Sequence, residues 1–141
     1  MAKRAANIAK EYVPRNNEPF MGHNQQSYFK RRLQDWKGDI LREAQETILY
    51  LQESPGQAPD IADRAATESE RSLELRARDR QRKLISKIDA AMHRIEEGSY
   101  GYCEETGEPI SVKRLIARPI ATLSIEAQER HERREKVYRD D

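Results

Sequence analysis

The sequence predicts an all-α fold built around a long antiparallel coiled-coil hairpin. Charged residues make up 36% of the chain, aromatic residues 6%, and glycine occurs only 6 times. This composition is typical of long charged helices with little strand. A length of 141 residues is that of one ordinary domain, so we expect one small globular end from which the hairpin projects.

The first arm of the hairpin is indicated by a heptad pattern of apolar and small residues that starts after Asn24. The residues of this seam are Phe29, Leu33, Trp36, Ile40, Ala44, Thr47 and Leu51. Such spacing is typical of a helix packed along a second helix. The segment SPGQAPD, residues 54–60, contains two prolines and a glycine and is predicted to break the helix.

A second seam with the same spacing follows the breaker and predicts the second arm. Its residues are Leu73, Ala77, Arg80, Leu84, Ile88, Ala91 and Ile95. Asp60 stands where a helix N-cap is expected, and Asp63 falls in the first turn, near the positive end of the helix dipole. Two seams joined by a short loop predict an antiparallel hairpin. Arms of about 30 to 35 residues give a rod of about 45 to 50 Å.

The remaining segments are read from their prolines and glycines. Gly98, Gly101, Gly107 and Pro109 indicate a turn-rich region, a short helix should end before Pro119, and a charged helix should follow from Ser124. The expected parts are an N-terminal arm (1–23), flexible or loosely docked; the hairpin (24–98) with its tip at 54–65; a degenerate zinc-finger-like region (99–123); and a C-terminal helix (124–141).

Several classes of function are disfavoured by the composition. The 26 basic and 25 acidic residues are interspersed, unlike the concentrated lysine and arginine of a nucleic-acid clamp. The chain has no continuous run of roughly 20 apolar residues, the length that spans a membrane, and it lacks the apolar run of a secretory signal. A single cysteine excludes an internal disulfide and suits the cytoplasm, where we expect the protein. No catalytic motif is found, so we do not expect an enzyme.

The sequence has the residue spacing of a four-cysteine zinc finger, in GYCEETGEP and the later LSIEAQE, but it lacks the finger's ligands. The residues at the ligand-like spacings are Cys103, Thr106, Ser124 and Ala127. A structural zinc site needs four thiolate or imidazole donors, whereas hydroxyl groups are poor ligands and alanine has none. We therefore predict no metal site, and the simplest interpretation of Cys103 is a buried or idle thiol.

Two groups of charged residues allow a structural and a functional interpretation. Arg80, Lys83 and Lys87 share one face of the second arm, which is most simply a solvated face. Asp60 and Asp63 are most simply cap and dipole residues. From physical principles alone, the sequence predicts a helical hairpin with a charged tip and nothing more specific.

The sequence resembles the DksA family of bacterial RNA polymerase secondary-channel regulators from about Tyr12 to Tyr138. Its most similar parts are residues 59–88, with the tip motif DxxDRA, and residues 101–119. The resemblance implies a non-enzymatic monomer that inserts the hairpin into the polymerase secondary channel. Its tip residues, Asp60, Asp63 and Ala65, would destabilise open complexes at ribosomal RNA promoters. Binding to specific DNA sequences or to membranes is not expected.

The resemblance also implies a response to the alarmone ppGpp at the polymerase interface. The residues expected there are Arg80, Lys83, Leu84, Lys87, Arg118 and Gln128. Gln128 stands where the usual member has a lysine, and loss of a cation weakens a phosphate site.

The resemblance is to the cysteine-poor branch of the family, so we expect no stably bound cofactor and no zinc. Apolar packing would then hold the finger together, through Tyr100, Tyr102, Ile110, Leu115, Ile116, Leu123 and Ile125. Two alternatives remain: a channel factor resembling the Gre proteins, whose tip acids support transcript cleavage, and a non-catalytic coiled-coil scaffold.

Overall fold

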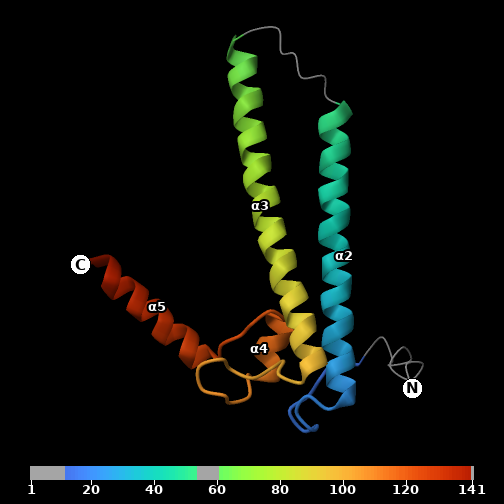
Figure 1. Ribbon diagram of the computed structural model, residues 1–141, viewed down its shortest axis with the longest axis vertical. Helices are drawn as coiled ribbons and strands as arrows, with labels where there is room; N and C mark the ends of the chain where they lie inside the picture. The colour runs from blue at the N-terminus through green and yellow to red at the C-terminus, as the bar shows by residue number, and fades with distance from the viewer. Residues whose placement is uncertain (1–11, 54–60, 141) are drawn as a thin grey trace. The chain divides into compact units, whose positions relative to one another are not determined.

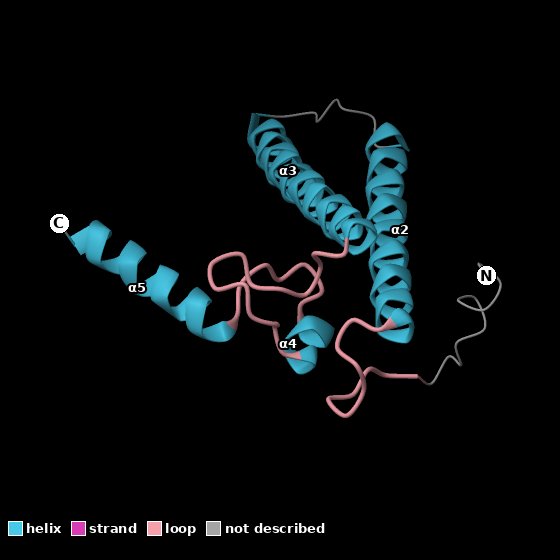
Figure 2. Ribbon diagram, turned by 60° about the horizontal axis from the view of Figure 1, so that its bottom comes forward, coloured by secondary structure: helices cyan, strands magenta, loops and turns pink. Residues whose placement is uncertain are grey.

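The computed structural model describes residues 12–53 and 61–140. They form the helices α2 (His23–Glu53), α3 (Ile61–Glu97), α4 (Val112–Ala117) and α5 (Ile125–Asp140) (Figures 1 and 2). Within these two ranges the only β-type pairing is an antiparallel bridge between Tyr102 and Pro109. The predicted all-α fold is confirmed, whereas the predicted breaker at 54–60 lies outside the described residues. None of the helices described is long and apolar enough to cross a membrane.

The chain divides into two units, and helices α2 and α3 contribute to both. One unit is Gln34–Asp89, and the other combines Met1–Leu33 with Ala90–Asp141. In the first unit, α2 and α3 run side by side as an antiparallel hairpin (Figure 1). Ile40 and Ile88 are buried between the arms, and Lys37 Nζ lies 2.7 Å from Asp89 Oδ1. The hairpin predicted from the two seams is therefore present.

The seam of α2 follows the predicted register. Of its predicted residues, Phe29, Leu33 and Ile40 are buried, and Trp36, Ala44 and Thr47 are half-buried. Leu51 lies in α2, but its side chain is outside the described part. Polar and charged residues take most of the remaining positions, although Leu41, Ile48 and Leu49 are exposed. A helix with one apolar stripe buries that stripe against its neighbour.

The seam of α3 differs from the prediction at two positions. Leu73 is 62% exposed and Arg80 is also exposed, whereas Glu74 and Gln81 are half-buried. From Ile95 back to Glu74 the inward residues repeat strictly every 3 or 4 positions, at 91, 88, 84, 81 and 77. The buried residues Ile88, Ala91 and Ile95 set this register, since a strict heptad keeps one stripe facing the partner helix. A leucine one position away from the stripe remains in solvent.

The core of the other unit is formed by the start of α2, the end of α3 and the turn-rich region. Phe29, Leu33, Tyr100, Ile110 and Leu115 are at most 2% exposed. The Phe29 and Tyr100 rings lie 5.5 Å apart, and the Tyr100 hydroxyl donates to the Pro119 carbonyl at 2.7 Å. Satisfying the buried hydroxyl allows an aromatic residue to fill this core without leaving an unpaired polar group.

The predicted packing of the finger is correct in part. Tyr100, Ile110 and Leu115 are buried and Ile116 and Leu123 are half-buried. Two predicted members are wrong, because Tyr102 is 39% exposed and Ile125 is 48% exposed. The Tyr102 ring instead makes an edge contact with Phe20, with centroids 5.4 Å apart.

Residues 12–22 are packed more closely than a loosely docked arm would be. Pro14 and Met21 are buried, and the Gln25 side chain, 1% exposed, connects this segment to the start of α2. Its Oε1 accepts from the Met21 N–H at 2.9 Å, and its Nε2 donates to the Arg15 carbonyl at 3.2 Å. A glutamine hydrogen-bonded at both ends of its amide fixes the entry of the chain into α2.

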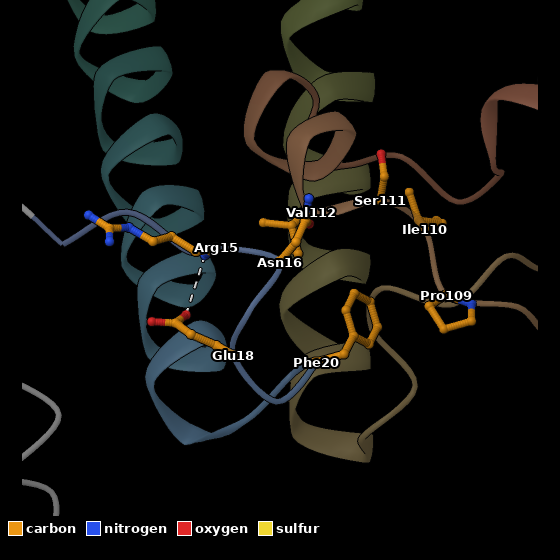
Figure 3. Close-up of a pocket in the computed structure, with 8 residues that line it drawn as sticks. All are labelled: Arg15, Asn16, Glu18, Phe20, Pro109, Ile110, Ser111 and Val112. Atoms are coloured by element: carbon orange, nitrogen blue, oxygen red, sulfur yellow. Dashed lines mark hydrogen bonds between the residues drawn. The ribbon is translucent and has the colours of Figure 1, made fainter.

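A cavity of about 210 Å³ lies between this N-terminal segment and the turn before α4 (Figure 3). It is lined by Arg15, Asn16, Glu18, Phe20, Pro109, Ile110, Ser111 and Val112. None of the residues proposed from the sequence as functional lines it, so the candidate site lies elsewhere.

Candidate functional site

The predicted tip residues lie at or near the start of α3. Asp60 is outside the described residues. Asp63 is in the first turn of α3, which begins at Ile61, and its side chain is not part of the description. Ala65 is exposed. The helix start just after Asp60 agrees with the sequence expectation for that end of the arm.

The basic residues predicted at the interface share one flank of α3. Arg80, Lys83 and Lys87 are all exposed, and their spacing of three and four places them on the same side of the helix. No ion pair joins any of the three to another residue in the described ranges. Leu84 points toward the seam and is half-buried. The flank therefore presents three cations to solvent.

Arg118 and Gln128 belong to the other unit. Arg118 caps the end of α4, where its backbone N–H donates to the Arg114 carbonyl at 2.7 Å, and it is exposed. Gln128 is half-buried on α5, and its Nε2 donates to Glu132 Oε1 at 3.2 Å. A lysine in place of Gln128 would have a carboxylate one turn away, which would partly neutralise it.

Three of the four ligand-like residues meet around the Cys103 sulfur. Cys103 is 2% exposed, and hydrogen bonds reach its thiol from the Thr106 side chain and from the backbone of Ser124. The Ser124 hydroxyl in turn accepts from the Ala127 N–H at 3.3 Å. Ala127 is fully buried. The residues at the ligand-like spacings of a zinc finger therefore come together in the structure, as their spacing in the sequence suggests.

These residues do not fit a zinc ion. They offer one sulfur, two hydroxyl groups that are already engaged, and a methyl group, whereas structural zinc takes four thiolate or imidazole donors. No group of three or more potential metal-binding side chains occurs within the described ranges. Hydrogen bonds and apolar packing thus stabilise this region, which a metal centre would stabilise in a four-cysteine finger.

The surroundings of Cys103 favour the thiolate. Burial raises the pKa of the thiol, but hydrogen bonds from the Thr106 hydroxyl and from the backbone N–H groups of Ser124, Thr106 and Glu105 outweigh it and lower the pKa to about 6. The folded protein therefore binds the Cys103 proton less tightly than the unfolded chain does. This contribution to stability is present at high pH and is lost as the pH falls through about 6.

We predict that the thiolate absorbance near 240 nm of the native protein develops with a midpoint near pH 6, since Cys103 is the only cysteine. In denaturant the midpoint should return to the ordinary cysteine value of about 8.5. The matched variant Thr106→Val removes the side-chain donor and should raise the native midpoint. A native midpoint equal to that of the denatured chain would contradict the hydrogen-bonded thiolate.

One polar contact of this region could not be predicted from the sequence. His131 Nε2 of α5 lies 2.7 Å from Glu105 Oε1, and Arg130 lies 3.7 Å from the same carboxylate. The contact connects α5 to the loop that carries Cys103. No local pattern relates residues this far apart in the chain, and only the fold brings them together.

Comparisons with known proteins agree with this geometry. Residues 25–95 match the family model described as "DnaK suppressor protein DksA, N-terminal domain". Residues 98–133 match the "prokaryotic dksA/traR C4-type zinc finger", although the chain has one cysteine. The match to this finger model is thus a match of fold and spacing rather than of ligands.

Relatives of similar length cover nearly the whole chain. The RNA polymerase-binding transcription factor DksA of Caulobacter vibrioides is 63% identical over 93% of this chain and 92% of its own length. The Escherichia coli K12 protein of the same name is 42% identical over 89% and 83%. The solved structure of transcription factor DksA2 from Pseudomonas aeruginosa superposes with a TM-score of 0.74 at 38% identity, covering 95% and 97% of the two chains. The chain belongs to the DksA family.

Proposed function

We propose that this protein is a transcription factor that binds RNA polymerase and tunes initiation, and that it is not an enzyme. The observation that carries the proposal is its 63% identity, over 93% of the chain, to a protein named RNA polymerase-binding transcription factor DksA. The antiparallel arms α2 and α3 supply a long, thin element suited to a narrow channel. Catalysis then belongs to the polymerase.

The hairpin acts in this proposal through its tip in the secondary channel. Asp60 and Asp63 bring carboxylates toward the cationic, metal-containing active site of the polymerase, where charge and hydrogen-bond acceptors act most strongly. Small residues such as Ala65 and Ala66 keep this end narrow, and both are exposed in α3. The consequence is a shorter lifetime of open complexes at sensitive promoters, ribosomal RNA promoters above all.

The cationic residues support a response to ppGpp at the polymerase interface. Arg80, Lys83 and Lys87 are exposed and unpaired within the described ranges, as a phosphate contact requires. Leu84 and Arg118 complete the proposed set. Gln128 offers a neutral amide in the place of a cation, so the effector should act more weakly here than on a lysine-bearing member.

The protein works without zinc in this proposal. The hydrogen bonds around Cys103 and the buried side chains of Ile110 and Leu115 hold the finger in place of a metal. A chelator should leave the melting temperature unchanged. Stoichiometric zinc in protein purified without added metal would exclude this view.

The test is transcription from a ribosomal RNA promoter by purified bacterial RNA polymerase, with and without the protein and ppGpp. We expect repression by the protein alone and stronger repression with ppGpp. A stalled elongation complex in the same assay distinguishes the Gre-like alternative, which predicts transcript cleavage. A scaffold predicts no effect in either reaction.

We predict that Gln128→Lys increases the additional repression caused by ppGpp without changing repression by the protein alone. The new cation adds a charge-assisted contact to phosphate, worth about 1.5 to 3 kcal/mol where it is fully formed. The matched control Glu129→Lys also adds a cation, on an exposed neighbouring position of α5. An equal ppGpp response in the wild type and both variants would show that residue 128 does not limit the effector site.

A further inference from the structure

The segment that precedes α2 is attached to the rest of its unit in two different ways. We call residues 12–22 the strap, and it belongs to the same unit as the finger, residues 99–123. The side chains of Gln25 and Gln26 in α2 hydrogen-bond to the strap. No hydrogen bond or ion pair joins the strap to the finger in the part of the chain that the structure describes. Side-chain packing therefore connects these two segments.

The close part of this packing is at Gly101. A Cβ atom added to Gly101 would lie 3.1 Å from Phe20 Cζ and 3.2 Å from Met21 Cε, which is tighter than ordinary van der Waals contact. Next to it, the Phe20 ring makes its edge contact with Tyr102. Toward residues 109–112 the strap leaves a cavity of about 210 Å³, so packing there is incomplete (Figure 3). Phe20 and Met21 thus rest directly on the backbone of residue 101.

Gly101 also closes the loop that carries Cys103. Its carbonyl accepts from the Ile110 N–H at 2.7 Å, and inside this pair the Cys103 N–H donates to the Glu108 carbonyl at 2.8 Å. A short hydrogen-bonded loop is marginally stable by itself and depends on the packing that holds its ends together. Displacement of Gly101 would therefore release the loop and expose the Cys103 thiol, which is 2% exposed in the structure.

Met21 adopts a backbone conformation that costs free energy while the strap is closed. Its φ is 52°, in the left-handed region that glycine adopts without strain and methionine seldom does. The Met21 N–H donates to Gln25 Oε1 at 2.9 Å, and its carbonyl accepts from Gln26 Nε2 at 2.7 Å. Such strain persists only where surrounding contacts hold it in place. Loss of those contacts would favour the open strap.

We propose that the strap and the Cys103 loop open and close as one unit, while the α2–α3 hairpin of residues 34–89 stays folded. The closed strap then stabilises a finger whose residues do not fit a zinc ion. Proteins open in cooperative parts, and the hairpin is a separate unit with its own buried residues, such as Ile40 and Ile88. The inference concerns the finger itself and does not depend on polymerase binding.

The first experiment measures the rate at which iodoacetamide modifies Cys103, the single cysteine, at one fixed pH. Met21→Ala removes the packing on Gly101 and should raise this rate by about tenfold or more, because truncation of a buried methionine favours the open state. The matched control is Val13→Ala, on the same strap but 48% exposed. It should change the rate by less than about twofold, as a surface truncation does.

A second pair of variants tests the same contact from the finger. Gly101→Ala and Gly98→Ala each place a side chain at positive φ, 90° and 83°, so their backbone costs are similar. The new Cβ meets Phe20 and Met21 at residue 101 but has nothing within 4 Å at residue 98. Gly101→Ala should therefore speed both Cys103 modification and amide hydrogen exchange of the strap, and Gly98→Ala should affect both far less.

The outcomes are read together with circular dichroism at 222 nm, which follows the helices of the hairpin. Faster Cys103 modification in Met21→Ala and Gly101→Ala, at an unchanged helical signal, supports the proposal. If the strap exchanges faster in these variants while Cys103 reacts at the wild-type rate, the strap moves alone and the proposal is wrong. Modification that rises only as the helical signal is lost would mean that finger and hairpin unfold together, which also overturns it.

Discussion

Replacing Phe29 with alanine is expected to lower the free energy of unfolding by about 3 to 5 kcal/mol, the usual cost of truncating a buried phenylalanine. Phe29 is 0% exposed, and its ring contacts those of Tyr28 and Tyr100, with centroids 5.2 and 5.5 Å away. The cavity left by the ring cannot collapse easily, because the helix ends and the finger surround it. Urea denaturation followed by circular dichroism at 222 nm measures the change.

The matched control for this prediction is Leu49→Ala, on the same helix but 51% exposed. A surface truncation should change the free energy of unfolding by no more than about 0.5 kcal/mol. Equal losses in the two variants would mean that Phe29 is not part of a tightly packed core. A loss confined to Phe29→Ala would agree with a core that both α2 and the finger complete.

The helix boundaries could be predicted because the chain marks them with strong local signals. Pro and Gly residues precede or follow each element, so the ends of α2, α3 and α4 fall close to the expected positions. Gly98, with φ of 83°, ends α3 in the left-handed conformation that glycine adopts without strain. Local chemistry of this kind needs no knowledge of tertiary contacts.

The seam of α3 shows where local signals were insufficient. Toward the C-terminal end of α3, apolar residues such as Ile88 and Ala91 are compatible with only one register of the helix against α2. Nearer the tip, Leu73 competes with Glu74 for the seam, and hydrophobicity favours the wrong one. The geometry of the arm, set at its base, overrides the preference of a single side chain.

The candidate site was predictable in its pattern but not in its contacts. The spacing of Cys103, Thr106 and Ser124 indicated a finger without zinc ligands, and these residues do meet. The contact of Glu105 with His131 and the hydrogen bonds of Gln25 join segments that no periodicity relates. The roles of Asp60, Asp63 and the basic residues came from the family resemblance, since cap residues and solvated cations have the same local signature.

Changing Asp63 to asparagine is expected to remove regulation of ribosomal RNA promoters while leaving polymerase affinity unchanged. Asparagine is similar in shape but neutral, and one of its two terminal groups is a donor, so it cannot replace a carboxylate beside a cationic active site. Asp63 falls in the first turn of α3, where loss of a carboxylate's interaction with the helix dipole should by itself cost only about 0.3 to 1 kcal/mol. The measurement compares open-complex lifetime and polymerase affinity for the variant and wild type.

Glu70→Gln is the matched control, since it neutralises an exposed carboxylate on the same helix about two turns from Asp63. It should shorten open-complex lifetime as wild type does. If Asp63→Asn also shortens it fully, the carboxylate serves the helix dipole alone and the tip has no direct part in regulation. If Asp63→Asn loses affinity together with regulation, the tip contributes to docking on the polymerase as well as to regulation. Normal affinity with lost regulation, in that variant alone, is the result that assigns the action to the tip.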